Sequence, residues 1–258
     1  MRTALTIAGS DSSGRAGIQA DLRTFAQIGV RGATAITAIT AQNAKGISTI
    51  APLEADLVTA QIEAVMSDIA SVGADNAGSA VHATKVGMLA NAAIAEAVVA
   101  AIEDLELPLV VLDPVIASST GTRLLDADGV QVLIAELLPR VLVVTPNIPE
   151  AEALSGKRIA SLSDVREAAR RLHGFGAANV IVKGGHLTGD EVVDVLFDGK
   201  AFHESRTARA PRAAARGTGC SFASAVAAFL ALDHALPDAA RRAQRHVASL
   251  LAAAQDVY

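Results

Sequence analysis

Gly217-Thr218-Gly219-Cys220 combines residue types that suit a site where a negatively charged group is transferred. Two glycines let the backbone fold so that several N–H groups point into one cavity, and the start of a helix adds partial positive charge. A run of small residues over 221–230 predicts that helix. The same field is expected to lower the pKa of the Cys220 thiol and make it a general base. Taken alone, the segment fits an ordinary helix start with a small buried cysteine slightly better.

Lys183-Gly184-Gly185-His186 places a cation at the end of an apolar run. The two glycines would permit a phosphate to approach the backbone closely. Phosphoryl transfer depends mainly on positioning and on charge stabilisation, so a lysine at this place has an evident role. A solvated lysine beside a turn is the alternative interpretation.

Asn147-Ile148-Pro149-Glu150 follows another apolar run. The side-chain oxygens of Asn147 and Glu150 suit the ordering of Mg²⁺ waters beside nucleotide phosphates, because hard cations prefer oxygen ligands. The same spacing fits an Asn N-cap with Glu150 reaching back from the third helical position, and alone this is the better interpretation. Asp113 ends a further apolar run and is a second candidate for the metal region, with the capping of a turn as its alternative.

Residues 9–16 match the glycine spacing of the P-loop G-x-x-x-x-G-K-[ST]. Arg15 replaces the phosphate-binding Lys, however, and Ala16 replaces the hydroxyl that would bind Mg²⁺. The segment does not fit G-x-G-x-x-G either. A tight turn that brings backbone close to a small ligand is the better interpretation, with a plain strand-to-helix turn as the alternative. The six His residues form no HExxH or Cys/His cluster, so a zinc site has little support.

Short apolar runs that alternate with helical stretches must position these segments, and they predict βα units around a parallel sheet. Strands are expected over residues 4–8, 33–40, 109–112, 141–144 and 180–182, with a hairpin of 192–197 and 201–205. Helices are expected over 16–28, 91–105, 131–138, 163–173 and 220–232 and after Pro237, and a mobile loop over 70–83. Because ligands of open parallel sheets lie beyond the carboxyl ends of the strands, the polar residues there should gather at one edge.

Composition narrows the class of protein further. The chain has 258 residues, 51% of them hydrophobic and 3% aromatic, and a formal net charge of −5. Few aromatics and no basic run argue against a nucleic-acid partner. No stretch approaches the ~18 uncharged apolar residues that span a membrane, and a single Cys suits a reducing compartment, so the cytoplasm is expected. Without an internal repeat or a clear linker, residues 1–258 are expected to form one domain.

Taken together, these segments resemble the hydroxymethylpyrimidine/phosphomethylpyrimidine kinases of thiamine biosynthesis, in the ribokinase-like superfamily. The resemblance runs from about residue 5 to about 253 and includes the stretches 4–11, 16–22, 37–43, 85–89, 145–150 and 183–186. It implies a three-layer α/β/α fold with a mostly parallel central sheet. It also implies ATP-dependent phosphorylation of 4-amino-5-hydroxymethyl-2-methylpyrimidine and of its monophosphate, with Mg²⁺, in a homodimer.

The resemblance also assigns roles to residues. The pyrimidine would be held by Gly9, Asp21, Gln42, Met88 and Val115. Cys220 would help to take the hydroxymethyl proton while amides of Gly217, Thr218, Gly219 and Cys220 stabilise the transferring phosphoryl group. Nucleotide binding would fall to Asp113, Asn147, Glu150, Lys183 and Thr218, with Lys183 neutralising phosphate and Asn147 and Glu150 positioning Mg²⁺ through water.

Four departures from the family pattern stand out. Arg15 occupies a place that is usually Gly, residues 116–121 lack the usual Lys, residues 70–83 are longer than expected, and the chain ends at Tyr258 without the usual tail. The nearest alternative is a pyridoxine or pyridoxal kinase, against which Ala41-Gln42-Asn43 favours the pyrimidine. A non-catalytic ligand-binding homologue is a second alternative. A sugar kinase is disfavoured because Cys rather than Asp stands at position 220.

Overall fold

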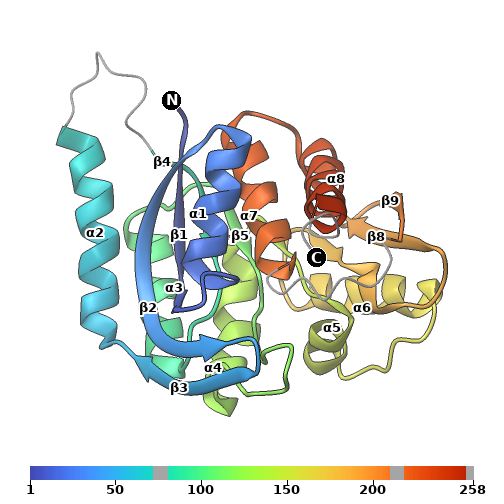
Figure 1. The fold of residues 1–258 in the computed structure, drawn as a ribbon, viewed down its shortest axis with the longest axis horizontal. Helices are drawn as coiled ribbons and strands as arrows, with labels where there is room; N and C mark the ends of the chain where they lie inside the picture. Colours follow the sequence, from blue (N-terminus) through green and yellow to red (C-terminus); the bar gives the residue numbers. More distant parts are fainter. Residues whose placement is uncertain (72–80, 210–217, 254–258) are drawn as a thin grey trace.

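One nine-stranded sheet forms the centre of the computed structural model, which describes residues 1–71, 81–209 and 218–253 (Figure 1). The strand order is β3-β2-β1-β4-β5-β6-β7-β8-β9. Strands β2, β1, β4, β5, β6 and β7 run parallel, and β3, β8 and β9 pair antiparallel at the two edges. Their bounds are Thr3–Asp11 (β1), Arg31–Asn43 (β2), Gly46–Pro52 (β3), Val81–Val86 (β4), Val110–Leu112 (β5), Val143–Val144 (β6), Val180–Val182 (β7), Glu191–Phe197 (β8) and Phe202–Ala208 (β9).

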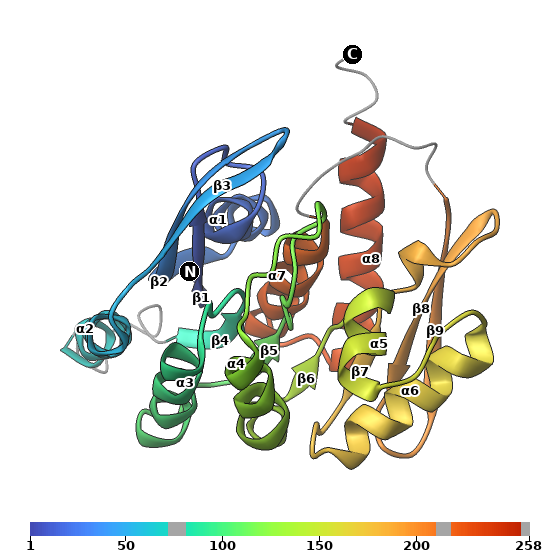
Figure 2. The ribbon, with the colours of Figure 1, turned by 90° about the horizontal axis from the view of Figure 1, so that it is seen from below.

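Helices cover both faces of the sheet, so the molecule has the predicted three layers (Figure 2). On one face lie α1 (Gly17–Ile28), α7 (Thr218–Ala231) and α8 (Leu236–Ala253). On the other lie α2 (Ala55–Ser71), α3 (Ala92–Asp104), α4 (Ala127–Val132), α5 (Ile148–Ser155) and α6 (Leu162–Gly174). Helix α4 continues through a π-helical turn, Leu133–Leu137, and a 3-10 turn, Leu138–Arg140. A further 3-10 turn, Gly184–His186, follows β7.

The central strands are apolar on both sides because each side packs against helices. In β7, Val180 and Val182 contribute to the core under α2–α6, whereas Ile181 contributes to the core under α1, α7 and α8. Strands that are buried on both faces read as continuous apolar runs instead of alternating ones. This is why the runs at 109–112 and 180–182 were visible in the sequence.

Helix ends follow from local side-chain chemistry. Ser161 accepts a hydrogen bond from the Asp164 N–H, and the Asp164 carboxylate accepts one from the Ser161 N–H at 2.8 Å, so the predicted capping box is confirmed. Asn91 caps α3 by accepting from the Ile94 N–H at 2.9 Å. The hairpin of β8 and β9 is also as predicted.

The predicted loop over 70–83 is wrong at both ends. Helix α2 runs to Ser71, and β4 begins at Val81; residues 72–80 lie outside the described part of the chain. The small residues in this stretch suggested a turn, but Val81–Val86 gains ladder partners in β1 and β5 that local composition does not reveal. The edge strand β3 and helix α2 were likewise not predicted.

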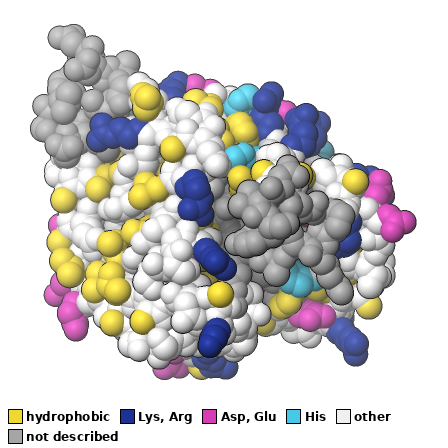
Figure 3. Space-filling view, in the orientation of Figure 1, with side chains coloured by type: hydrophobic (Ala, Val, Ile, Leu, Met, Phe, Trp, Pro, Cys, Tyr) yellow, Lys and Arg dark blue, Asp and Glu magenta, His cyan; other side chains and the backbone are white. Residues whose placement is uncertain are grey.

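Charged side chains are sparse on the face shown in Figure 3. Basic side chains are scattered over this face, and most of the acidic ones lie near its margin. Among the helices of residues 1–71, 81–209 and 218–253, none has the length and apolar character needed to cross a membrane.

The turn after β7 packs tightly against β8 at Gly184. A Cβ on Gly184 would lie 1.9 Å from the backbone oxygen of Val193. The Gly184 N–H donates to the Asp194 carboxylate at 2.8 Å. Burial raises the pKa of Asp194 to about 6, although this hydrogen bond and the charge of Lys183 oppose the rise. The direction in which the chain leaves β7 therefore depends on a residue without a side chain.

Gly184→Ala should lower the free energy of unfolding by about 1–3 kcal/mol, because the new Cβ must displace backbone. Gly185→Ala is the matched control: its Cβ would meet no atom within 4 Å, and Gly185 is exposed. We expect the control to stay within about 0.5 kcal/mol of wild type. Urea unfolding of both variants measures the difference, and an equal loss in the two would contradict the prediction.

Candidate active site

Three of the predicted residues meet where β5, β7 and α7 converge. Asp113 follows β5 and Lys183 follows β7, and the Lys183 Nζ donates to Asp113 Oδ1 at 2.8 Å. Gly219, in the first turn of α7, lies against this pair: a Cβ there would be 3.3 Å from the Lys183 Nζ. Lys183 is only 9% exposed, so it is not a solvated surface lysine. The expectation that polar residues at strand ends gather at one edge is confirmed for these residues.

Asn147 and Glu150 form a capping box at the start of α5. The Glu150 N–H donates to Asn147 Oδ1 at 2.9 Å, and the Asn147 N–H donates to Glu150 Oε2 at 2.8 Å. Asn147 also forms an isolated parallel bridge with Lys183, which places the start of α5 beside the Lys183–Asp113 pair. The capping interpretation of this segment is thus confirmed, and the position beside Lys183 leaves a cofactor role open to the same residues.

Burial governs the charges in this part of the site. It raises the pKa of Glu150 to about 7; Lys183 opposes this effect and Asp113 adds to it. Burial alone would lower the pKa of Lys183, but the charges of Asp113 and Glu150 outweigh it and raise that pKa. Lys183 therefore stays protonated, and the Glu150 carboxyl holds its proton to a higher pH than an ordinary glutamate does.

Cys220 lies one residue beyond Gly219, in the first turn of α7. The residue is half-buried, and its thiol is a neighbour of the Gly17 N–H, which hydrogen-bonds to it. Burial raises the pKa of the thiol to about 12; Lys85 and the Gly17 N–H lower it, and Asp113 and Asp21 raise it. The predicted lowering of this pKa is therefore wrong for the free protein, because removal of the thiol from water exceeds the favourable charges.

Asp21 is completely buried and has no open face toward a ligand. Its Oδ2 accepts from Thr6 Oγ1 at 2.6 Å and from Lys85 Nζ at 2.8 Å, and its Oδ1 accepts from Ser224 Oγ at 2.6 Å. In this geometry Asp21 can influence a substrate only through these partners. The sequence did not assign roles to Lys85, Thr6 and Ser224. A lysine directly before the uncharged run 86–89 could have pointed to Lys85.

Three of the other predicted pyrimidine-binding residues lie together. A Cβ on Gly9 would be 3.0 Å from the Met88 Sδ, so the backbone of β1 touches that side chain directly. Met88 packs with Ala38 and Leu124, and Val115 lies against the same small cluster. The Thr37 hydroxyl donates to the Met88 carbonyl at 2.6 Å. These contacts form an apolar wall beside the ends of β1 and β2.

Gln42 is half-buried near the end of β2. The Ser12 hydroxyl accepts from its backbone N–H at 2.9 Å and donates to its carbonyl at 3.0 Å. Within the described residues the Gln42 side-chain amide has no hydrogen-bond partner, so its donor and acceptor are both available. Ser12 thus ties this residue to the turn that follows β1.

The turn between β1 and α1 is tight, as predicted. The Asp11 carboxylate accepts N–H groups of Ser13, Arg15 and Ala16 at 2.8, 3.0 and 2.8 Å. Gly17 has φ +59°, and a Cβ there would be 2.3 Å from the Gly9 oxygen, so only glycine allows this approach.

The remaining predicted positions lie as follows. The Arg15 side chain, one of the four departures from the family pattern, is exposed. The loop at 116–121 is closed by backbone bonds such as Ser118 N–H to the Thr122 carbonyl at 2.8 Å. Gly217 lies outside the described residues, whereas Thr218 begins α7.

The donor set suits a cation that keeps most of its water. Among the described residues, no group of three or more His, Cys, Asp or Glu side chains could hold a metal ion directly. Mg²⁺ usually binds through one or two carboxylates together with substrate phosphates and retains several waters. Glu150 and Asn147, whose side-chain oxygens lie together at the start of α5 beside Lys183, fit that mode.

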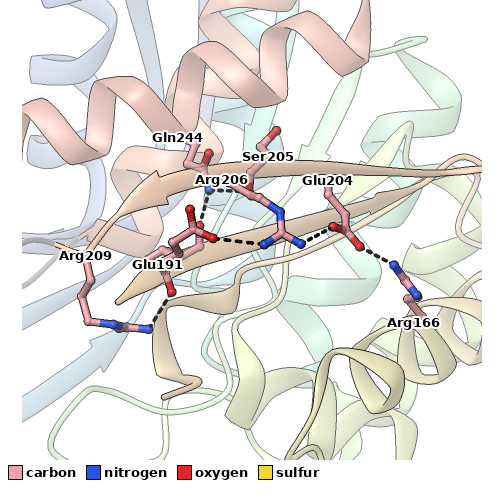
Figure 4. A network of polar contacts seen from close by, with 8 residues as sticks. Arg166, Glu191, Glu204, Ser205, Arg206, Arg209 and Gln244 are labelled. Carbon is pink, nitrogen blue, oxygen red and sulfur yellow. Dashed lines mark hydrogen bonds and ion pairs between the residues drawn. The ribbon is translucent and has the colours of Figure 1, made fainter. Parts of the chain in front are cut away.

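Two hollows of about 260 and 390 Å³ lie elsewhere, between β9 and α8. Two of their charged lining residues, Glu204 and Arg206, belong to a surface network in which Arg206 pairs with Glu191 at 3.1 Å and with Glu204 at 2.8 Å (Figure 4). Arg166 pairs with Glu204 as well, at 2.5 Å. Exposed ion pairs of this kind contribute little to stability. None of the predicted site residues lines either hollow.

Comparisons with known proteins identify the family to which the chain belongs. The family model of phosphomethylpyrimidine kinase matches residues 11–257. The thiamine biosynthesis bifunctional protein ThiED of Geobacter sulfurreducens is 45% identical over 97% of this chain, but the chain spans only 49% of that protein. The hydroxymethylpyrimidine/phosphomethylpyrimidine kinase of Aquifex aeolicus is 40% identical over 87% of this chain and 84% of the length of that kinase.

Solved structures show the same likeness. A phosphomethylpyrimidine kinase of Clostridium difficile is 35% identical and has a TM-score of 0.83. The match covers 97% of this chain and 100% of the chain of that kinase. The pyridoxal kinase of Staphylococcus aureus in complex with AMP-PCP and pyridoxal is 34% identical and has a TM-score of 0.84. The match covers 96% of this chain and 87% of the chain of that kinase. The chain therefore belongs to the phosphomethylpyrimidine kinase family and has the ribokinase-like fold.

Proposed function

We propose that the chain, as one kinase domain, transfers the γ-phosphoryl group of ATP to 4-amino-5-hydroxymethyl-2-methylpyrimidine and then to its monophosphate, in thiamine biosynthesis. The observation that carries the proposal is the meeting of Lys183, Asp113 and the first turn of α7, which holds Cys220. The names of the curated relatives support the pyrimidine as substrate.

The transfer step needs charge stabilisation more than covalent chemistry. A phosphate held at the start of α7 would meet backbone N–H groups of Thr218, Gly219 and Cys220 and the positive end of the helix dipole. Lys183 lies directly against this turn, so its ammonium would neutralise part of the phosphate charge. The helix and the lysine together would stabilise the negative charge of the transferring group.

The proton of the acceptor hydroxyl is assigned to Cys220. The hydroxymethyl oxygen forms a bond to the γ-phosphorus, the bond from that phosphorus to the oxygen of ADP breaks, and ADP keeps the electron pair. The hydroxyl proton moves to the Cys220 sulfur, which must be a thiolate at that moment. Because burial raises the pKa of the thiol in the free protein, Cys220 must first release its proton to water, and the thiolate then takes the proton of the acceptor hydroxyl.

Asn147 and Glu150 would hold Mg²⁺ through its waters, and the bound ion would shield the phosphate charge. The position of the capping box beside Lys183 supports this assignment. Gly9, Met88 and Val115 would provide the apolar wall of the pyrimidine pocket, and the Gln42 amide would provide a donor and an acceptor for the aminopyrimidine edge. A homodimer and a cytoplasmic location stay predictions from the sequence.

Pyridoxal is the second candidate substrate. Pyridoxal kinases are among the structural neighbours, with TM-scores of 0.83 to 0.85 against 0.83 for the pyrimidine kinase of Clostridium difficile. Against pyridoxal stand Gln42 and the naming of the curated relatives, which refers to the pyrimidine or to thiamine biosynthesis.

ADP release with Mg-ATP tests the proposed function directly. We expect turnover with hydroxymethylpyrimidine and with its monophosphate, and less with pyridoxal and ribose. Turnover of only one pyrimidine would limit the activity to one step. Preference for pyridoxal would move the function to vitamin B6 salvage, and binding without turnover would favour a non-catalytic homologue.

Cys220→Ala should reduce kcat by about 10²–10⁴-fold, because general base catalysis contributes that much. Cys220→Ser is the matched variant: its hydroxyl has nearly the size of the thiol but ionises far less readily, so we expect a comparable loss. Circular dichroism should show the wild-type fold in both. Near-wild-type turnover of Cys220→Ala would exclude the proposed base role.

Gln42→Ala should raise KM for hydroxymethylpyrimidine about tenfold or more, because a buried polar edge of the substrate would lose its partner. The KM for Mg-ATP serves as an internal control and should change by less than about twofold. Steady-state kinetics with each substrate varied separately measure both constants. Equal rises in the two constants would count against the assignment of Gln42 to the pyrimidine.

A further inference from the structure

A second buried ion pair, Asp21–Lys85, lies close enough to Cys220 for both charges to act on its thiol, and it has no part in the transfer described above. Both side chains are fully buried, and the Lys85 Nζ donates to Asp21 at 2.8 Å. Four elements build the pair: Thr6 comes from β1, Asp21 from α1, Lys85 from β4 and Ser224 from α7.

Helices α1 and α7 bring this pair next to Cys220 through two matched contacts. The Gly17 N–H reaches the Cys220 thiol, and the Asp21 carboxylate accepts from the Ser224 hydroxyl at 2.6 Å. Gly17 and Asp21 are four residues apart on α1, as are Cys220 and Ser224 on α7. Residues at this spacing lie on one face, one turn from each other. Lys85, bound to Asp21, therefore lies near the Cys220 thiol, and its charge lowers the pKa of that thiol.

The space for the Lys85 ammonium comes from a glycine. A Cβ on Gly87 would lie 2.5 Å from the Lys85 Nζ and 3.1 Å from the Ala8 Cβ. Any side chain at position 87 would thus displace the ammonium from its place between β1 and α7. Gly87 follows β4 directly, where its N–H donates to the Ile7 carbonyl at 2.9 Å.

Stability alone does not account for a pair in this position. Two charges that are removed from water lose solvation that their attraction seldom repays in full, and apolar residues of similar volume often serve a fold equally well. An ammonium held immobile beside a thiol that must ionise, by contrast, has a direct chemical consequence.

We propose that Lys85 is the positioning residue that stabilises the Cys220 thiolate, and that Asp21 acts by holding Lys85 rather than by binding the pyrimidine. The charged groups that face the thiol are Lys85 from β4, Asp21 from α1, Asp113 after β5 and Lys183 after β7. Lys85 lowers the pKa of Cys220 more than Asp21 raises it. The carboxylates raise the pKa of Lys85 above its usual value in spite of burial, so the ammonium is present throughout the working range.

The inference deepens the proposed role of Cys220 and can be measured without turnover. Cys220 is the only cysteine of the chain, so alkylation by iodoacetamide reports this thiol alone. Only the thiolate reacts, and below the pKa its amount falls tenfold for each unit by which the pKa rises. The rate is measured from pH 7 to pH 10, with Cys220→Ser as the blank.

Lys85→Met should slow alkylation at pH 8 by about tenfold or more, because loss of a nearby cation shifts a pKa by about one unit or more. Lys85→Met/Asp21→Asn removes both charges and leaves hydrogen-bonding groups for Thr6 and Ser224, so it should fold even if the single variant does not. It should also react more slowly than wild type, by a smaller factor. Ser224→Ala loosens the same cluster without removing a charge, so it should slow alkylation clearly less than Lys85→Met does.

Alkylation of the double variant at the wild-type rate or faster would overturn the inference. A slowing in Ser224→Ala equal to that in Lys85→Met would do the same, because the effect would then be one of packing. Lys85→Met should also lower kcat while leaving KM for Mg-ATP nearly unchanged. If Cys220→Ala keeps its turnover while Lys85→Met still slows alkylation, the base role of Cys220 fails and the effect of Lys85 on the thiol stands.

Discussion

The contact between α1 and α7 is the constraint on which the site depends. It is made where the carboxylate of Asp21 binds Ser224 and Lys85, and where the backbone of Gly17 meets Cys220. The bonds of Asp21 to Thr6, Lys85 and Ser224 join β1, β4 and both helices through side chains that have no access to water. A shift of α7 along α1 would break them together, so the first turn of α7 is held at one height above the sheet.

Charges of opposite sign alternate outward from this contact. Asp21 is followed by Lys85, then by Asp113 after β5 and by Lys183 after β7, with Glu150 at the start of α5. Cys220 lies among them, and its thiol keeps its proton because burial exceeds the help that the two lysines give. Such a site is close to neutral before substrates bind. The arrival of negatively charged phosphates changes this balance, which is why the positions of both ammonium groups matter for the chemistry.

Elements with strong local signals were predicted well. Residues 180–182 form β7 as expected, since three apolar β-branched residues between polar ones leave few alternatives. The capping pairs Ser161/Asp164 and Asn147/Glu150 were recognisable because both partners lie within one helical turn. Val81–Val86, by contrast, follows a stretch of small residues, and its strand exists because β1 and β5 provide partners from distant parts of the chain. The cysteine's pKa was predicted in the wrong direction for a similar reason, since burial depends on what packs around a residue.

The sequence by itself determined the alternation of strands and helices, the resemblance to a kinase family, and most of the residues at the ends of β5, β7 and at the start of α5. These features can be recognised in the sequence because they depend on residues that are neighbours along the chain. Only the tertiary structure decided that Asp21 faces Lys85 and not open space, and that Gly219 touches Lys183. Both contacts join residues far apart in the chain, and the depth of burial that sets their charges exists only when the helices and the sheet have closed around them.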